Sequence, residues 1–224
     1  MTQELVKGLP YQMTPFAIFD LDGTLIDSMP VWEGIDHEML TARGVVYDPV
    51  ATTEATKAMS IEEAIEYWRE HFGVTDSTEE LVAEVNARIR NAYATTVPLK
   101  ANVHEYLDHL KRQGVRMCVA TSSELKQVEI VMRRLDLWDR FEFVLSARQV
   151  GRGKEFPDIY LEAARRMGAT PEQCTVYEDT LVAVKTAAKA GFHTVGVADT
   201  CGAAAAAEIS AASECYILDY AQMM

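Results

Sequence analysis

The sequence predicts an α/β fold, a doubly wound parallel sheet with a small helical domain inserted after its first strand. Three observations predict it. From residue 98 onward, short apolar runs alternate with segments of helical periodicity, which is the pattern of parallel βαβ units. Residues 27–97 show helical periodicity without strand-like runs. Polar residues directly follow three of the predicted strands.

The first strand is predicted at 16–19, where a short apolar run is typical of a buried parallel strand. Apolar residues stop at Asp20, and Gly23 permits a sharp turn just beyond. Asp20 and Asp22 therefore lie at the C-terminal edge of a central strand, where open α/β sheets bind ligands. Taken by itself, Asp-x-Asp-Gly is equally well explained as a solvated turn.

The inserted block is predicted to be a bundle of four short helices. Apolar residues recur in it at helical spacing, for example Leu81, Val85 and Ile89. The predicted helices run from about 31 to 43, from 49 onward, from 60 to 73 and from 77 to 93. We therefore expect two domains, an α/β core of residues 14–26 and 98–224 and a helical insert of residues 27–97.

Beyond Pro98 the predicted order of elements is regular. The predicted strands are 115–120, 141–145, 174–177, 194–197 and 216–218. The predicted helices are 103–113, 124–135, 158–167, 181–190 and 203–212. Strands that alternate with helices of about ten residues predict a parallel sheet covered on both faces.

Composition and charge exclude several classes of function. The 224 residues carry a net charge of −13, which disfavours nucleic acids and anionic membranes as partners. Four cysteines without CxxC spacing are expected to be reduced, as in a cytosolic protein: Cys118, Cys174, Cys201 and Cys215. No apolar run approaches the roughly 20 residues of a membrane span, and the first residues do not resemble a signal peptide. We expect a cytoplasmic protein, most simply a monomer.

The carboxyl ends of parallel strands meet at one edge of a sheet, so the polar residues that follow them are expected to converge. Each has a structural explanation when taken singly, as a helix cap or as a solvated surface group. Their joint occurrence, each after a predicted strand or in a Gly-rich loop, argues against coincidence. The residues are Asp20, Asp22, Thr121, Ser122, Lys154, Glu178 and Asp179.

These residue types suit phosphoryl transfer. The carboxylates of Asp20, Asp22 and Asp179 are ligands that Mg²⁺ favours, and the metal would screen a carboxylate nucleophile from a phosphate dianion. Thr121 can donate a hydrogen bond to a phosphate oxygen, and Lys154 supplies a cation. A carboxylate nucleophile needs a separate acid for the leaving group, and Asp22 is the nearest candidate.

The order Asp-x-Asp-Gly-Thr-Leu, strand-Thr/Ser, Lys-x-x-Pro-Asp-x-Tyr and Glu-Asp-Ser/Thr resembles the haloacid dehalogenase superfamily from Phe16 to Leu218. The insert is similar to the α-helical cap domain of its phosphatase and β-phosphoglucomutase branch. The resemblance implies a Rossmann-like core, a nucleophilic Asp20 that forms an aspartyl-phosphate, and Asp22 as general acid/base. It also implies further roles: catalysis by Thr121 and Lys154, phosphate binding by Gly23, Ser122 and Lys154, and Mg²⁺ binding by Asp20, Asp22 (through its backbone carbonyl), Glu178 and Asp179.

The chain departs from the family pattern in two loops. Residues 99–102 read Leu-Lys-Ala-Asn where relatives often carry Pro-Gly, so the shape of that turn is open. Glu155 follows Lys154 directly and could form an ion pair with it, which leaves Arg152 as an alternative cation.

Several reactions occur in this superfamily, and the sequence favours one of them. Asp22 disfavours dehalogenation, because the halide-cleaving relatives need neither a metal nor a leaving-group acid and lack this aspartate. Phosphonate hydrolysis uses a cap lysine, and nothing supports that role for Lys57, which is the only lysine in residues 28–97. A Mg²⁺-dependent phosphomonoesterase for a small phosphorylated metabolite is therefore expected.

Two alternatives stay open at this point. A sugar-phosphate mutase of the β-phosphoglucomutase type would share the same core. A binding module that has lost activity is less favoured, because Asp20, Lys154 and Asp179 are all present. Substrate specificity would depend on insert residues, for which the candidates are Trp32, Asp36, Lys57 and Tyr67.

Overall fold

The computed structural model describes residues 13–56, 59, 61–199 and 205–224. The chain divides into two compact units, one of Met1–Met29 with Pro98–Met224 and the other of Pro30–Val97. Lys57 and Cys201, which the sequence singled out, lie outside the described residues.

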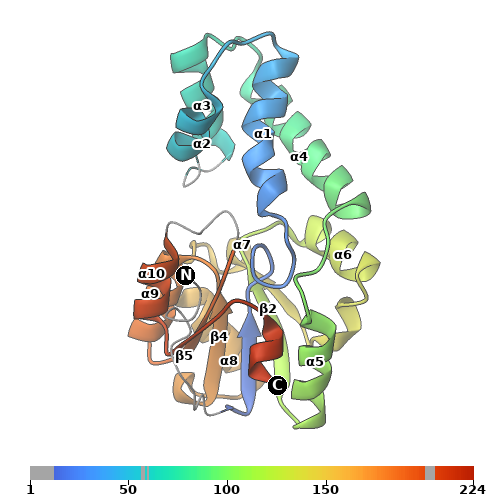
Figure 1. Ribbon diagram of the computed structural model, residues 1–224, viewed down its shortest axis with the longest axis vertical. Helices are drawn as coiled ribbons and strands as arrows, with labels where there is room; N and C mark the ends of the chain where they lie inside the picture. The colour runs from blue at the N-terminus through green and yellow to red at the C-terminus, as the bar shows by residue number, and fades with distance from the viewer. Residues whose placement is uncertain (1–12, 57–58, 60, 200–204) are drawn as a thin grey trace. The chain divides into compact units, whose positions relative to one another are not determined.

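The larger unit contains a six-stranded sheet whose described strands are all parallel (Figure 1). Its strands are β1 (Phe16–Phe19), β2 (Arg116–Thr121), β3 (Val144–Ser146), β4 (Cys174–Glu178), β5 (His193–Val197) and β6 (Cys215–Ile217). Their order in the sheet is β3-β2-β1-β4-β5-β6. This order reverses direction between β1 and β4, which is the place where doubly wound sheets bind ligands. The predicted fold class is confirmed.

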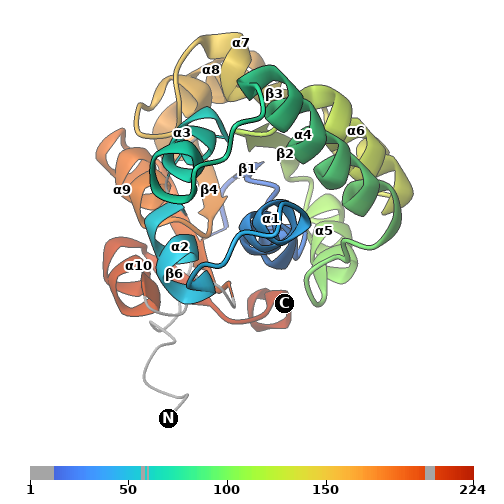
Figure 2. The same ribbon diagram turned by 90° about the horizontal axis from the view of Figure 1, so that it is seen from above.

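Helices cover both faces of the sheet. The helices of this unit are α5 (Val103–Arg112), α6 (Leu125–Arg134), α7 (Ala147–Val150), α8 (Asp158–Met167), α9 (Leu181–Lys189) and α10 (Ala206–Ala212). Figure 2 separates α8 and α9, on one side of the sheet, from α5 on the other.

The two faces of the sheet bury different side chains. Against α8 and α9 the core is mainly aliphatic, with Ile18 of β1 and Val176 of β4 fully buried. On the other face Phe19 stacks on Tyr177 at a centroid distance of 4.2 Å. Tyr106 of α5 completes this aromatic layer and shares a 2.6 Å hydrogen bond with the Tyr177 hydroxyl. Both faces of β1 and β4 are therefore buried, which explains the uniformly apolar sequence of β1.

One predicted strand differs from the structure. The run 141–145 was expected to be a strand throughout, but β3 begins only at Val144. A 3₁₀ turn (Trp138–Arg140) precedes it, and the Phe141 ring packs edge-on against Phe19 at 5.9 Å. The aromatic side chains at 141 and 143 imitate strand alternation, whereas Phe141 packs into the core ahead of the strand.

The smaller unit is helical. Its helices are α1 (Met29–Ala42), α2 (Pro49–Thr56), α3 (Ile61–Phe72) and α4 (Thr78–Thr95). The Asp36 carboxylate accepts hydrogen bonds from Trp68 Nε1 at 3.0 Å and from the Thr56 hydroxyl. Asp36 therefore joins α1, α2 and α3 in the interior of this unit. Asp36, predicted as a candidate for substrate contact, is occupied by these structural bonds.

Candidate active site

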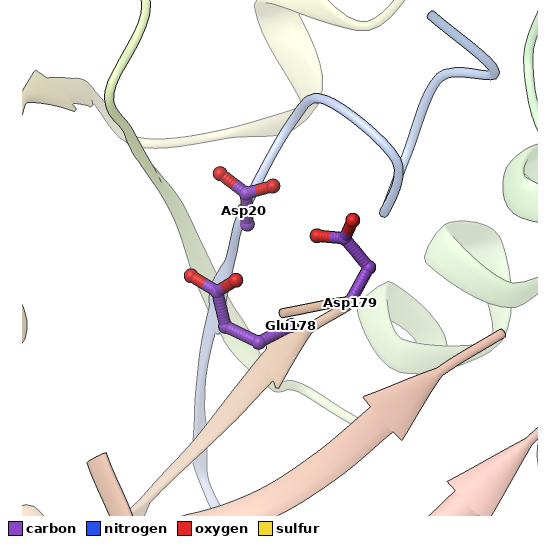
Figure 3. A group of neighbouring side chains, drawn as sticks. All are labelled: Asp20, Glu178 and Asp179. Atoms are coloured by element: carbon purple, nitrogen blue, oxygen red, sulfur yellow. The ribbon is translucent and has the colours of Figure 1, made fainter. Parts of the chain in front are cut away.

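Three carboxylates meet where β1 and β4 end. Asp20 follows β1, Glu178 is the last residue of β4, and Asp179 comes directly after it. Each offers one carboxylate oxygen, and these oxygens all lie within 4.8 Å of one another (Figure 3). The cause is the register, which pairs Phe19 with Tyr177 and so places the next residue of each strand at the same level. All three side chains are buried.

Lys154 provides the positive charge at this cluster. Its Nζ donates hydrogen bonds to Asp20 Oδ1 and, at 2.6 Å, to Glu178 Oε1. Among the ion pairs of the described residues, Lys154 contacts Asp20 and Glu178 and not Glu155. The Arg152 guanidinium lies 4.8 Å from the centroid of the Phe156 ring. The lysine, and not Arg152, is therefore the cation at the carboxylates.

The cluster holds more carboxylates than positive groups, and this excess of negative charge shifts the pKa values of its members. Burial, which is the largest cause, and the charges of Glu178 and Asp22 together raise the pKa of Asp20 to about 7, against the lowering effect of Lys154. Burial and the charges of Asp20, Glu178 and Asp199 also raise the pKa of Asp179 well above its usual value. Burial would lower the pKa of Lys154, but the charges of Asp20 and Glu178 outweigh it and raise that pKa. Three carboxylates thus share one ammonium group.

The cluster fits a hard divalent cation. Glu178 Oε2 is buried and accepts no hydrogen bond from the described residues. Oxygen ligands of this kind suit Mg²⁺, which commonly binds through a few carboxylates and completes its shell with water and substrate phosphate. A second positive charge would also offset the excess of negative charge.

Gly23 is required for the geometry of the loop after β1. Its φ is +78°, and its backbone N–H donates to Ile26 O at 2.9 Å. A Cβ at this position would lie 2.7 Å from Cγ of Asp179 and nearer still to its Oδ2. The turn expected at Gly23 is confirmed, and the missing side chain also makes room for Asp179. The role of Gly23 in phosphate binding stays a prediction.

Asp22 has a different environment from Asp20. Its carboxylate lies outside the three-residue cluster and accepts hydrogen bonds at 2.6 Å from Ser28 Oγ to Oδ1 and from Ser123 Oγ to Oδ2. Sequence reasoning missed both serines. Ser123 extends the Thr-Ser-Ser run after β2, which was a usable signal, whereas Ser28 had none. The metal contact expected through the backbone carbonyl of Asp22 stays a prediction.

The two hydroxyl residues after β2 differ in exposure. Thr121 is buried at the end of the strand, and its Oγ1 accepts a 3.0 Å hydrogen bond from the backbone N–H of Ser123. Ser122 is exposed. The following helix α6 has its N-cap at Glu124, so neither residue is a helix cap. The alternative explanation, that Thr121 and Ser122 cap the following helix, is therefore wrong. Phosphate contact by these two residues stays a prediction.

The loop at residues 99–102 forms its turn without the Pro-Gly that relatives often carry. Asn102 takes the left-handed conformation, with φ of 60°, which Asn tolerates better than most residues. Its Nδ2 donates to Asp219 Oδ1 at 2.6 Å. Lys100 Nζ donates at 2.7 Å to both Asp199 Oδ2 and Ala198 O, just beyond β5. These bonds stabilise the turn that the sequence left open.

Comparison with known proteins shows the family of the chain. The family model for haloacid dehalogenase-like hydrolases matches residues 16–191. The chain belongs to this family. Hexitol phosphatase B of Escherichia coli strain K12 is 32% identical over 167 residues, which cover 74% of this chain and 75% of the relative. Fructose-1-phosphate phosphatase YqaB of the same strain is 30% identical over 196 residues, 84% of this chain and 98% of the relative.

Solved structures show the same fold. CbbY from Rhodobacter sphaeroides, in complex with phosphate, superposes with a TM-score of 0.77 at 22% identity and covers 94% of this chain and 96% of its own. A putative β-phosphoglucomutase from Thermotoga maritima has a TM-score of 0.74 at 25% identity, and the match covers 90% of this chain and 93% of the other.

These findings make the protein an enzyme, a haloacid dehalogenase-like phosphatase. The alternative of a module without catalytic activity is thereby set aside. Among the described residues, no helix combines the length and hydropathy needed to cross a bilayer.

Proposed function

We propose that this phosphatase hydrolyses phosphomonoesters of a small metabolite with Mg²⁺ and through an aspartyl-phosphate on Asp20. The observation that carries the proposal is the convergence of Asp20, Glu178 and Asp179 around Lys154, with Asp22 outside the cluster. Mg²⁺ bound by the cluster and by the backbone carbonyl of Asp22 would neutralise charge on the transferring phosphoryl group.

The proposed hydrolysis has two steps, and different residues act in each. In the first, an oxygen of Asp20 attacks phosphorus, the bond to the ester oxygen breaks, and Asp22 gives that oxygen a proton. In the second, Asp22 takes a proton from water, the water oxygen attacks the phosphorus of the aspartyl-phosphate, and the bond from phosphorus to Asp20 breaks, which releases phosphate and restores the Asp20 carboxylate. Lys154 balances the charge of Asp20 before the transfer, and Thr121, Ser122 and the backbone at Gly23 hold phosphate oxygens.

The substrate class is proposed from the relatives. Two of them are named for hexitol phosphates and fructose 1-phosphate, so phosphorylated hexoses and hexitols are the first candidates. Residues 27–97 are proposed to act as the cap that contacts the leaving group. Trp32 and Tyr67 are half-buried in this unit, and their part in specificity stays a prediction. A monomeric state and a cytoplasmic location likewise stay predictions from the sequence.

The test compares the wild-type protein with D20N. Phosphate release is measured with Mg²⁺ on a panel of hexose and hexitol phosphates, nucleotides and phosphorylated acids. We expect the wild type to act on the sugar phosphates and D20N to lose at least about 1,000-fold in kcat, because its amide is no nucleophile. D139N is the matched control, since Asp139 is exposed and should not affect turnover.

Two outcomes would contradict the proposal. Full activity in D20N would exclude the covalent role of Asp20. Rearrangement of a glucose 1-phosphate isomer without net phosphate release would identify the mutase alternative instead.

A further inference from the structure

Glu178 receives two hydrogen bonds on the same carboxylate oxygen. Lys154 Nζ donates to Oε1 at 2.6 Å, and the Tyr160 hydroxyl donates to the same Oε1 at 2.7 Å. The other oxygen, Oε2, is buried and has no hydrogen-bond partner among the described residues. The protein therefore occupies one oxygen of this carboxylate and leaves the other one available within the acidic cluster.

Tyr160 is held rigidly by its surroundings. It lies in the first turn of α8 and is fully buried in the core between that helix and the sheet. Its ring packs edge-on against Phe192, with centroids 6.1 Å apart. Because packing fixes the ring, the direction of the hydroxyl is fixed as well, and Glu178 is the acceptor that it reaches.

The two donors to Glu178 differ in what else they do. Lys154 is shared, since it also pairs with Asp20. Transfer of a phosphoryl group to Asp20 would change the charge that this ammonium faces. The Tyr160 hydroxyl makes no second hydrogen bond within the described residues. It can hold Glu178 in the same place whether Lys154 is directed to Asp20 or not.

We infer that Tyr160 is a positioning residue for the metal site, one that orients Glu178 so that Oε2 remains free to bind the cation. The inference rests on the proposed function, because it takes Glu178 to be a metal ligand. Tyr160 acts only through Glu178. Partners of this kind, one step removed from the metal, commonly matter almost as much as the ligands themselves.

The experiment measures Mg²⁺ binding to Y160F by isothermal titration calorimetry, without substrate. Phenylalanine keeps the ring and its contact with Phe192, so the metal-free melting temperature should stay close to that of the wild type. We expect Mg²⁺ to bind about 10-fold more weakly. In steady-state assays the Mg²⁺ concentration for half-maximal rate should rise by the same factor, while kcat at saturating Mg²⁺ stays near the wild-type value.

Two further variants separate positioning from general stability. Y106F is the matched control, because Tyr106 is also a buried tyrosine with a hydroxyl in a hydrogen bond, at 2.6 Å to Tyr177. It should bind Mg²⁺ like the wild type. The double variant Y160F/E178Q should bind Mg²⁺ no more weakly than E178Q, since Tyr160 acts through Glu178.

The outcomes are distinguishable. Equal Mg²⁺ affinity in Y160F and the wild type overturns the inference, and so do additive losses in the double variant. A wild-type protein that shows no Mg²⁺ binding overturns the proposed metal role itself, and the Tyr160 inference with it.

Discussion

Asp20 and Asp22 are only two residues apart, yet their carboxylates have different partners. Asp20 is buried beside Lys154 and belongs to the acidic cluster, whereas two serine hydroxyls bind Asp22. The strand ends at Phe19 and Gly23 turns the chain, so the two side chains enter different surroundings. Separate environments are what a nucleophile and a proton donor require.

Replacement of Gly23 tests how tightly this loop is built. G23A places a methyl group within 2.7 Å of Asp179 Cγ and keeps a left-handed φ of +78°. We expect a loss of stability of more than about 1–2 kcal/mol, which is the usual cost of that conformation for an L-residue. We also expect weak activity, because Asp179 must move. Urea unfolding and phosphate release measure the two effects.

Gly168 offers a matched control for the strain. Its φ is +69°, but a Cβ there would meet nothing within 4 Å. G168A should therefore show the cost of the conformation without the clash, and retain activity. If G23A and G168A behaved alike, the proximity of Asp179 would not matter.

At the scale of elements, the sequence predicted helices with a clear apolar periodicity better than it predicted short strands. Helix α4 was predicted from the spacing of Leu81, Val85 and Ile89. The structure adds a capping box at its start, in which Ser77 and Glu80 exchange hydrogen bonds. The short strand β3 was placed less well, because its start depends on where Phe141 packs. Elements of three or four residues carry too little periodicity to locate their ends.

The buried Asp36 makes the stability of the helical unit depend on pH. Burial raises its pKa above the usual value, against the hydrogen bonds from Thr56 and Trp68. A raised pKa means that the folded unit binds the proton more tightly than the unfolded chain. The contribution of Asp36 is therefore fully present below its unfolded pKa and is lost as pH rises through the folded pKa.

D36N tests this dependence. An amide can accept from Trp68 and donate to Thr56, and it does not ionise, so we expect D36N to be at least as stable as the wild type at pH 8. The advantage should shrink toward pH 4, where the wild-type carboxyl takes up its proton. Urea unfolding followed by tryptophan fluorescence measures both. Parallel stability curves for the two proteins would show that Asp36 is not responsible.

At the scale of the whole molecule, the strand order decides the position of the site. β1 lies between β2 and β4, so residues more than 150 positions apart, Asp20 and Glu178, become neighbours. The net charge of −13 opposes the approach of an anionic substrate, and a cation bound at the acidic cluster would offset it locally.

Metal binding should therefore stabilise the folded protein. A ligand at 100 times its dissociation constant adds about 2.7 kcal/mol to the free energy of unfolding, so we expect Mg²⁺ to raise Tm and a chelator to lower it and abolish activity. D179N should lose most of this shift, and D139N should keep it. Unchanged turnover after chelation would exclude the metal role.

The sequence by itself determined the fold class, the order of most elements and the placement of Asp20, Glu178 and Asp179 at one edge of the sheet. Those properties follow from hydrophobic periodicity and from the rule that parallel strands end on one side. Only the tertiary structure decided that Ser28 and Ser123 bind Asp22, that Lys154 rather than Arg152 meets Asp20, and that Tyr160 holds Glu178. The reason is that hydrogen bonds between distant side chains depend on packing, and no local pattern encodes them.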